Sequence, residues 1–180
     1  MNLSFPNRTK FTNGTLVSGK LNANLTSAGF VFTGLTPGNY ALNLTTTIKV
    51  FLPPVSASVS SGSNALNLTV YQLSTFGIIV NATLAFNGTQ PGPPITVKNG
   101  TAVRLMIQNN TTQVFNIAVV RNLFNTSSDN VQFNSLSSTI SAGGSVNDTF
   151  IVSVVGAFYY QSMIENQAKQ GEYGNFTVAF

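Results

Sequence analysis

Three polar side chains near the C-terminus, Ser162, Gln167 and Glu172, are spaced five residues apart. Their hydroxyl, amide and carboxylate oxygens are hard donors of the kind that Mg²⁺ and Ca²⁺ prefer, but three groups with a single carboxylate make a poor cage for either ion. A blue-copper centre needs two imidazoles and a thiolate, and the sequence contains no His and no Cys. The spacing therefore predicts a polar loop of fixed length that binds no metal.

Acid/base and nucleophilic catalysis are also short of suitable groups. The chain has four acidic residues, which are Asp129, Asp148, Glu165 and Glu172. Without His or Cys, no pair of titratable groups of the usual catalytic kind is present, and no motif places a Lys beside a Ser. We therefore predict that the protein is not an enzyme and has no cofactor.

The elements around these residues are predicted to be β-strands. Runs of β-branched, aromatic or alternating residues are separated by turn signals such as Thr36–Asn39 and Pro91–Pro94. Short strands at this spacing predict an all-β Greek-key sandwich, with a turn around 162–169 as the one helical feature. The expected strands are 29–33, 40–52, 66–73, 77–86, 95–97, 101–108, 114–120, 147–155, 158–161 and 175–180.

Glycines and aromatic residues frame the polar loop. Gly156, Phe158 and Tyr160 precede it, and Gly171 and Gly174 stand near its end. This frame resembles the copper-binding end of the cupredoxin family, and most of all its sulfocyanin-like members. The resemblance covers residues 66–180 and implies a cupredoxin-like sandwich.

The same resemblance assigns the family's copper-ligand positions to residues that do not bind copper. Ser162 stands at the cysteine position, Gln167 at a histidine position and Glu172 at the methionine position. The remaining histidine position, usually followed by Asn, falls on Phe115, which is followed by Asn116. These four are therefore vestigial ligand positions, and type 1 copper is excluded by the missing imidazole and thiolate.

The composition is unusual for its lack of charge. Only 7% of the 180 residues are charged, against about 25% in ordinary proteins, while 43% are hydrophobic. With so few carboxylates, little protonation accompanies acidification, and we expect an acid-stable fold whose stability hardly changes between about pH 2 and 7. The eight basic residues are scattered singly, which excludes a nucleic-acid interface.

The sequence is rich in the N-glycosylation triplet Asn-x-Ser/Thr. Fourteen such sequons occur, where random placement of the same residues gives about five. This excess predicts a secreted, glycosylated surface, in which sugars provide the hydration that charges usually provide. The sequons begin at Asn2, Asn7, Asn13, Asn24, Asn43, Asn67, Asn81, Asn87, Asn99, Asn109, Asn110, Asn125, Asn147 and Asn175.

The chain is expected to divide into an N-terminal β segment, residues 1–65, and a cupredoxin-like sandwich, residues 66–180. A segment of 65 residues forms a marginal core alone, so we favour packing shared with the sandwich. No run of 18 apolar residues is present, and no transmembrane segment is predicted.

Two functions fit these observations. The first is an extracellular, N-glycosylated structural subunit of a cell-surface filament or surface layer, a homopolymer without redox activity held by β-strand contacts, with residues 2–25 as a candidate donor strand. The second is a copper-free accessory domain that docks a membrane or respiratory complex through an apolar face around Phe115, Met163 and Tyr173. The density of sequons favours the first.

Overall fold

The structure is a computed structural model that divides into two compact units, Met1–Gln72 and Leu73–Phe180. The boundary expected from the sequence was after Ala65. The structure describes residues 2–4, 11–16, 21–22, 24–26, 29–31, 37–46, 50–51, 53, 56–59, 65–67, 71–81, 85–164 and 166–180.

The first unit contains two small sheets, of order β4-β5-β1-β9 and β3-β2-β6-β8. The described parts of the candidate donor segment, residues 2–25, are paired within the chain, because β1 pairs with β5 and β9, and β2 pairs with β3 and β6. These strands are β1 (Asn2–Ser4), β2 (Phe11–Leu16), β3 (Leu21–Asn22), β4 (Asn24–Thr26), β5 (Gly29–Val31), β6 (Gly38–Thr46), β8 (Ser56–Val59) and β9 (Ala65–Asn67). A further strand, β7 (Val50–Phe51), pairs with Tyr71 and Gln72 at the start of β10.

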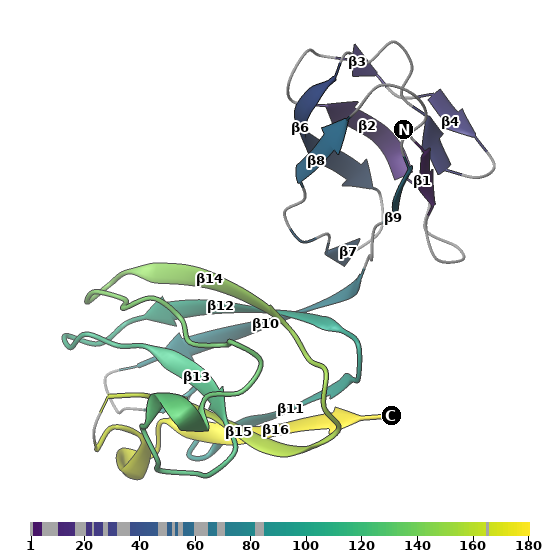
Figure 1. The fold of residues 1–180 in the computed structure, drawn as a ribbon. Coiled ribbons are helices and arrows are strands. Elements are labelled where there is room, and N and C mark those ends of the chain that lie inside the picture. Colours follow the sequence, from purple (N-terminus) through teal and green to yellow (C-terminus); the bar gives the residue numbers. More distant parts are fainter. Residues whose placement is uncertain are drawn as a thin grey trace. The chain divides into compact units, whose positions relative to one another are not determined.

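The second unit is a sandwich of two mixed sheets. In one layer β12 lies between β10 and β14, and the other layer has the order β11-β16-β15-β13 (Figure 1). β10 and β12 run parallel, as do β11 and β16, whereas the β12–β14, β13–β15 and β15–β16 pairs are antiparallel. The strands are β10 (Tyr71–Val80), β11 (Gly92–Lys98), β12 (Ala102–Asn109), β13 (Ile117–Val120), β14 (Ser145–Ile151), β15 (Gly156–Ser162) and β16 (Tyr173–Ala179).

Alternating side chains build the core between these layers. Along β16, Gly174, Phe176 and Val178 are buried and the residues between them are exposed, as expected of a strand with one face on the core. A group of aromatic rings fills one end of the core around Phe133, whose ring lies 5.1 Å from that of Phe158. Apolar burial of this extent is the main stabilising term of the unit.

The glycine and aromatic frame has a packing role. Tyr160 on β15 is directly opposite Gly174 on β16, and a Cβ atom at Gly174 would overlap the tyrosine ring. A Cβ at Gly92 would lie 2.5 Å from the Tyr160 hydroxyl, which donates a 2.7 Å hydrogen bond to the carbonyl of Pro93. The Tyr160 ring also stacks on Phe86, at 5.3 Å between centroids. The frame is therefore explained by the room that a buried tyrosine needs.

The all-β sandwich predicted from the sequence is confirmed. Two expected strands, 66–73 and 77–86, both overlap β10, which passes through Gly77 without interruption, while Ala65–Asn67 form the separate strand β9. Among the described residues the helical content is two short 3₁₀ turns, η1 (Ser128–Asn130) and η2 (Ala168–Gln170). None of the described helices is long and apolar enough to span a membrane.

Candidate functional site

The four vestigial ligand positions meet at one end of the sandwich. Ser162 ends β15, Gln167 precedes η2, and Glu172 immediately precedes β16. Phe115 lies in the loop between β12 and β13. All four are buried, with exposed fractions of 6% or less. The loop spacing that the sequence shares with cupredoxins therefore brings these residues together.

Hydrogen bonds between side chains fill the centre of this site. The Ser162 hydroxyl donates a 2.7 Å bond to Oε1 of Gln167. The amide nitrogen of Gln167 donates in turn to Oε1 of Gln113 at 3.1 Å and to the carbonyl of Val114 at 3.4 Å. This chain of bonds links the 162–172 loop to the loop that follows β12.

Backbone bonds fix the same loop from both ends. The N–H of Ser162 donates to the carbonyl of Glu172 at 3.0 Å, and the N–H of Met163 donates to the carbonyl of Asn116 at 3.2 Å. The Ser162 hydroxyl also accepts the N–H of Ile164, at 3.2 Å. Hydrogen bonds thus hold the loop at its predicted length.

Phe115 occupies its position as a core residue. Its ring packs edge-on against Phe86, at 5.9 Å between centroids. Its backbone exchanges two hydrogen bonds with Ile140, of 3.0 and 2.7 Å. Because Phe115 is only 1% exposed, the docking face predicted around Phe115, Met163 and Tyr173 lacks its central residue.

Glu172 is the chemically unusual member of the site. It is fully buried, and neither carboxyl oxygen has a hydrogen-bond partner among the described residues. Burial raises the pKa of Glu172 from 4.5 to about 7, against a smaller lowering effect of the neighbouring Ser162 hydroxyl. Because the Ser162 hydroxyl donates its one proton to Gln167, it cannot also donate a hydrogen bond to the Glu172 carboxyl and so does not offset the cost of burying it. A protonated Glu172 therefore fits this site better than an ionised one.

A second carboxyl shares this behaviour. Asp148 on β14 is paired in register with the buried Leu105, so its side chain lies on the core side of the sheet. Its Oδ2 atom is buried and has no hydrogen-bond partner within the described ranges, and burial raises the pKa of Asp148. For both groups the folded state binds the proton more tightly than the unfolded state does. The free energy of unfolding therefore falls as the pH rises from the pKa of the group in the unfolded state through its pKa in the folded state. The flat stability between pH 2 and 7 that we expected from the small number of carboxylates is therefore revised.

The residues of this site do not fit copper. They are a phenylalanine ring, a hydroxyl, an amide and a carboxyl, whereas type 1 copper takes imidazole and thiolate ligands. Ser162 and Gln167 use their oxygens on each other, which leaves Glu172 as the remaining donor. No cluster of three or more His, Cys, Asp or Glu is found within the described ranges. We derive no copper chemistry from this chain's own residues.

In a comparison with protein families, residues 70–179 match the model described as multicopper oxidase. The chain belongs to the multicopper oxidase family. Comparison with curated protein sequences gives no match. The family covers the second unit, and with the sandwich topology it confirms the cupredoxin-like resemblance.

Among solved structures, auracyanin shares the fold of this multicopper oxidase domain. Reduced auracyanin from the photosynthetic bacterium Roseiflexus castenholzii is 20% identical with a TM-score of 0.50, over 59% of this chain and 97% of auracyanin. A laccase from Botrytis aclada is 21% identical with a TM-score of 0.47, over 60% of this chain and 22% of the laccase. The blue copper oxidase of Nitrosomonas europaea is 20% identical with a TM-score of 0.49, over 59% of this chain and 39% of that protein.

Family membership corrects one prediction. We predicted from the missing catalytic groups that the protein is not an enzyme, and that prediction is wrong because the chain belongs to a family of oxidases. The prediction considered only the side chains that this chain itself supplies. Oxidases of this family use several copper ions, as the name states, whereas this chain has neither His nor Cys.

The structure also places the predicted glycosylation sites of the second unit. Asn99, Asn110, Asn125, Asn147 and Asn175 have exposed side chains. Asn87 is exposed as well, but its amide is hydrogen-bonded to the backbone of β10, and Asn81 is half-buried. The side chains of the remaining predicted sites lie outside the described residues, and these are Asn2, Asn7, Asn13, Asn24, Asn43 and Asn67.

Asn109 differs from the other sequon residues because it is completely buried. Its amide nitrogen donates to the carbonyls of Gln113, Ile140 and Ser141 at 2.8, 3.1 and 3.1 Å. Its Oδ1 atom accepts from the N–H and the hydroxyl of Thr111 at 3.0 and 2.7 Å. In the folded domain this amide is therefore a structural group, inaccessible to a glycosylating enzyme.

Proposed function

We propose that this domain is a structural subunit of an extracellular cell-surface filament or layer, glycosylated on its surface and joined to further copies of itself by β-strand contacts. The observation that carries the proposal is the open outer edge of β14. The proposal concerns what this domain contributes to the assembly. Copper chemistry of the family's kind would need ligands from outside this sequence.

Strand β13 has an edge that is closed by side chains. The hydroxyls of Ser137 and Ser135 accept the N–H groups of Ile117 and Val119, at 3.0 and 2.8 Å. The carbonyls of Ile117 and Val119 accept the N–H groups of Ser137 and Gln132, at 2.9 and 2.8 Å. A segment that satisfies both donors and acceptors leaves nothing for an incoming strand.

Two further edges are blocked over part of their length, in different ways. The side chain of Asn87 imitates a neighbouring strand along β10, since Oδ1 accepts the N–H of Ile79 at 2.7 Å and Nδ2 donates to the carbonyl of Gly77 at 3.0 Å. Strand β11 contains Pro93 and Pro94, which have no N–H to donate to a partner strand.

Strand β14 keeps its outer edge open. The residues at either end of β14 bond toward β12. The carbonyl of Gly144 accepts the N–H of Asn109 at 2.9 Å, and the N–H of Val152 donates to the carbonyl of Thr101 at 3.0 Å. Because antiparallel pairing alternates, the backbone groups of Ser145, Asn147, Thr149 and Ile151 point away from β12. Within the described ranges no strand pairs with this side. An open edge of this kind accepts a strand from another molecule by main-chain hydrogen bonding.

The surface chemistry supports an extracellular location. Charged residues make up only 7% of the sequence, and besides Asn87 five sequons of the second unit have exposed asparagines. Sugars on these sites would keep an uncharged assembly hydrated. A sugar on Asn147 would stand on the face of the sheet, since strand side chains project perpendicular to it, and would leave the backbone edge free.

The experiment compares two substitutions at one position of β14. Asn147→Pro removes an outward N–H and its sequon without breaking a bond to β12, and Asn147→Gln removes only the sequon. We expect wild-type protein and Asn147→Gln to form polymers, seen by electron microscopy and size-exclusion chromatography, and Asn147→Pro to remain monomeric. Polymers of folded Asn147→Pro would refute assembly through β14.

A further inference from the structure

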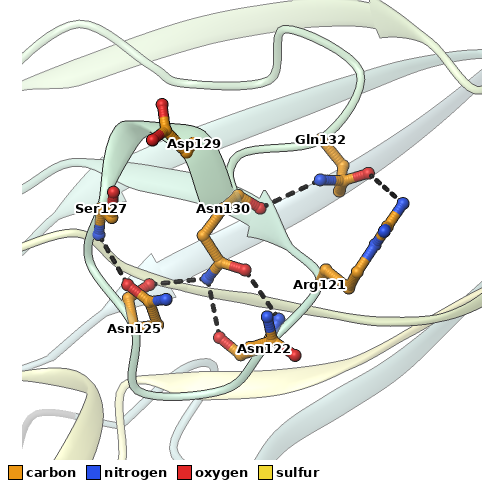
Figure 2. Close-up of a pocket in the computed structure, with 7 residues that line it drawn as sticks. All are labelled: Arg121, Asn122, Asn125, Ser127, Asp129, Asn130 and Gln132. Atoms are coloured by element: carbon orange, nitrogen blue, oxygen red, sulfur yellow. Dashed lines mark hydrogen bonds between the residues drawn. The ribbon is translucent and has the colours of Figure 1, made fainter.

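A polar pocket lies in the loop that follows β13, beside the short turn η1. Its volume is about 410 Å³, and every residue that lines it is polar. Pockets of roughly 300–1,000 Å³ are typical of small-molecule sites. Arg121 and Asn125 lie on opposite sides of Asn130 in this loop (Figure 2).

The floor of the pocket is rigid because its central residue is fully bonded. Asn130 is 5% exposed, and its Oδ1 atom accepts the N–H of Asn122 at 2.8 Å. Its amide nitrogen donates to the carbonyls of Asn122 and Asn125, both at 2.7 Å. These bonds fix the loop in a defined shape before anything binds, which lowers the entropy cost of binding.

The rim offers groups that are only weakly used. The guanidinium of Arg121 makes one long contact of 3.5 Å, to Oε1 of Gln132. Asp129 and Ser127 line the same pocket, and their side chains form no hydrogen bond or ion pair within the part of the chain that the structure describes. One positive and one negative group cancel, so the rim does not select an ion, and a lining made of polar residues does not favour a lipid. Donors and acceptors in this mixture suit a neutral, polyhydroxylated ligand.

The same rim carries a sequon, Asn125-Thr126-Ser127. The Asn125 side chain is exposed, and its Oδ1 atom accepts the N–H of Ser127 at 2.9 Å. Its Nδ2 atom, which is the atom that carries an N-linked sugar, makes no hydrogen bond among the described residues. A sugar attached here would begin at the edge of a pocket that suits sugars.

We propose that Asn125 carries an N-linked glycan whose first sugars lie in this pocket, held by Arg121 and the neighbouring amides. Attachment forms a bond between Nδ2 and the anomeric carbon of the sugar. It breaks the bond from that carbon to the diphosphate of a lipid-linked oligosaccharide donor, and Nδ2 loses one proton. The bond from Ser127 to Oδ1 survives, because the amide oxygen takes no part. This inference rests on the glycoprotein character in the proposed function.

The test uses three substitutions in the full chain, produced in a host that glycosylates it. Ser127→Ala removes the sequon and keeps the backbone bond to Asn125, whereas Ser127→Thr keeps both. Arg121→Ala leaves the sequon intact and removes the main rim contact. Occupancy of Asn125 is read by glycopeptide mass spectrometry, and hydrogen exchange is measured for the backbone amides of residues 121–132.

We expect Asn125 to be occupied in wild-type protein, Ser127→Thr and Arg121→Ala. Exchange of residues 121–132 should become about fivefold faster in Ser127→Ala and in Arg121→Ala, the equivalent of one net hydrogen bond. A bare Asn125, or an occupied one with equal exchange in all four proteins, would overturn the inference. If other sequons carry sugar and Asn125 does not, this inference alone fails. If no sequon carries sugar, the glycoprotein part of the proposed function fails with it.

Discussion

Glu172→Gln is the most informative single change in this chain. The substitution keeps the shape of the side chain and removes its charge at every pH. In the wild-type protein both carboxyl oxygens of Glu172 are buried without a hydrogen-bond partner in the part of the chain that the structure describes, and burial raises the pKa of this group from 4.5 to about 7. The folded state therefore holds a proton that the unfolded state releases at a lower pH.

The size of the effect follows from that difference. Below pH 4.5 Glu172 is protonated in both states, and its contribution to stability is greatest. As the pH rises through about 7, the free energy of unfolding falls by about 3 kcal/mol, at roughly 1.4 kcal/mol for each pH unit. Asp148 adds to the fall with the same sign, because burial raises its pKa also. In the Gln variant only the part due to Asp148 remains.

The assay is denaturant unfolding of the full chain between pH 4 and 8.5, followed by near-ultraviolet circular dichroism of the buried Tyr160. The quantity compared between wild type and Glu172→Gln is the slope of the free energy of unfolding against pH. The buried amide of the Gln variant shifts that free energy by the same amount at every pH, so it does not change the slope. Adding Asp148→Asn to Glu172→Gln should flatten the slope further. A wild-type stability that stays level or rises between pH 5 and 8, or a Gln variant that keeps the wild-type slope, would refute the reasoning.

Three further predictions concern packing and the vestigial ligand positions. Gly174→Ala should destabilise the fold by about 1–3 kcal/mol, because the added Cβ atom overlaps the Tyr160 ring. Gly77→Ala is the control and should not destabilise the fold, since no atom lies within 4 Å of its added Cβ. Equal melting temperatures of the two variants would contradict this prediction. Asn109→Asp loses three donated hydrogen bonds and should lower the free energy of unfolding by about 2 kcal/mol in denaturant unfolding. Asn110→Asp, at an exposed position, should lower it little. A stable Asn109→Asp variant would count against the structural role of Asn109. Placing two imidazoles, a thiolate and a thioether at the four vestigial positions should give a blue, copper-binding protein. A folded variant that stays colourless with Cu²⁺ would show that the geometry has been lost. The replacements are F115H, S162C, Q167H and E172M.

Much of the second unit could be predicted from sequence because its strands follow simple rules. The alternation of buried and exposed residues along β16 is visible as Gly174, Phe176 and Val178. The constant spacing of Ser162, Gln167 and Glu172 predicted that they share a loop, and the structure brings them together. The strand alternation and the loop spacing are local sequence patterns, and this chain keeps them although it lacks the copper ligands.

Other features depend on contacts that no local pattern records. A glutamate in a loop is expected to lie on the surface, and only the folded structure shows that Glu172 is buried. Asn87 and Asn109 match the same sequon pattern, yet one closes a strand edge and the other fixes two loops. A strand was expected to begin at Gly77, although this residue lies within β10.

The pocket beside Asn130 was also missed by sequence reasoning. Its residues form no recognised motif, and the sequon at Asn125 was one of fourteen similar signals. The only available sign was the number of amide and hydroxyl side chains between Asn122 and Gln132. Which of them face a common pocket is decided by the turn that η1 makes.

Electron microscopy of native cell-surface material is the measurement that bears most directly on the proposed function. We expect a repeating filament or layer in which this chain is the recurring unit and neighbouring copies pair along β14. Single copies, or copies bound to an unrelated protein without contact through β14, would contradict the proposal.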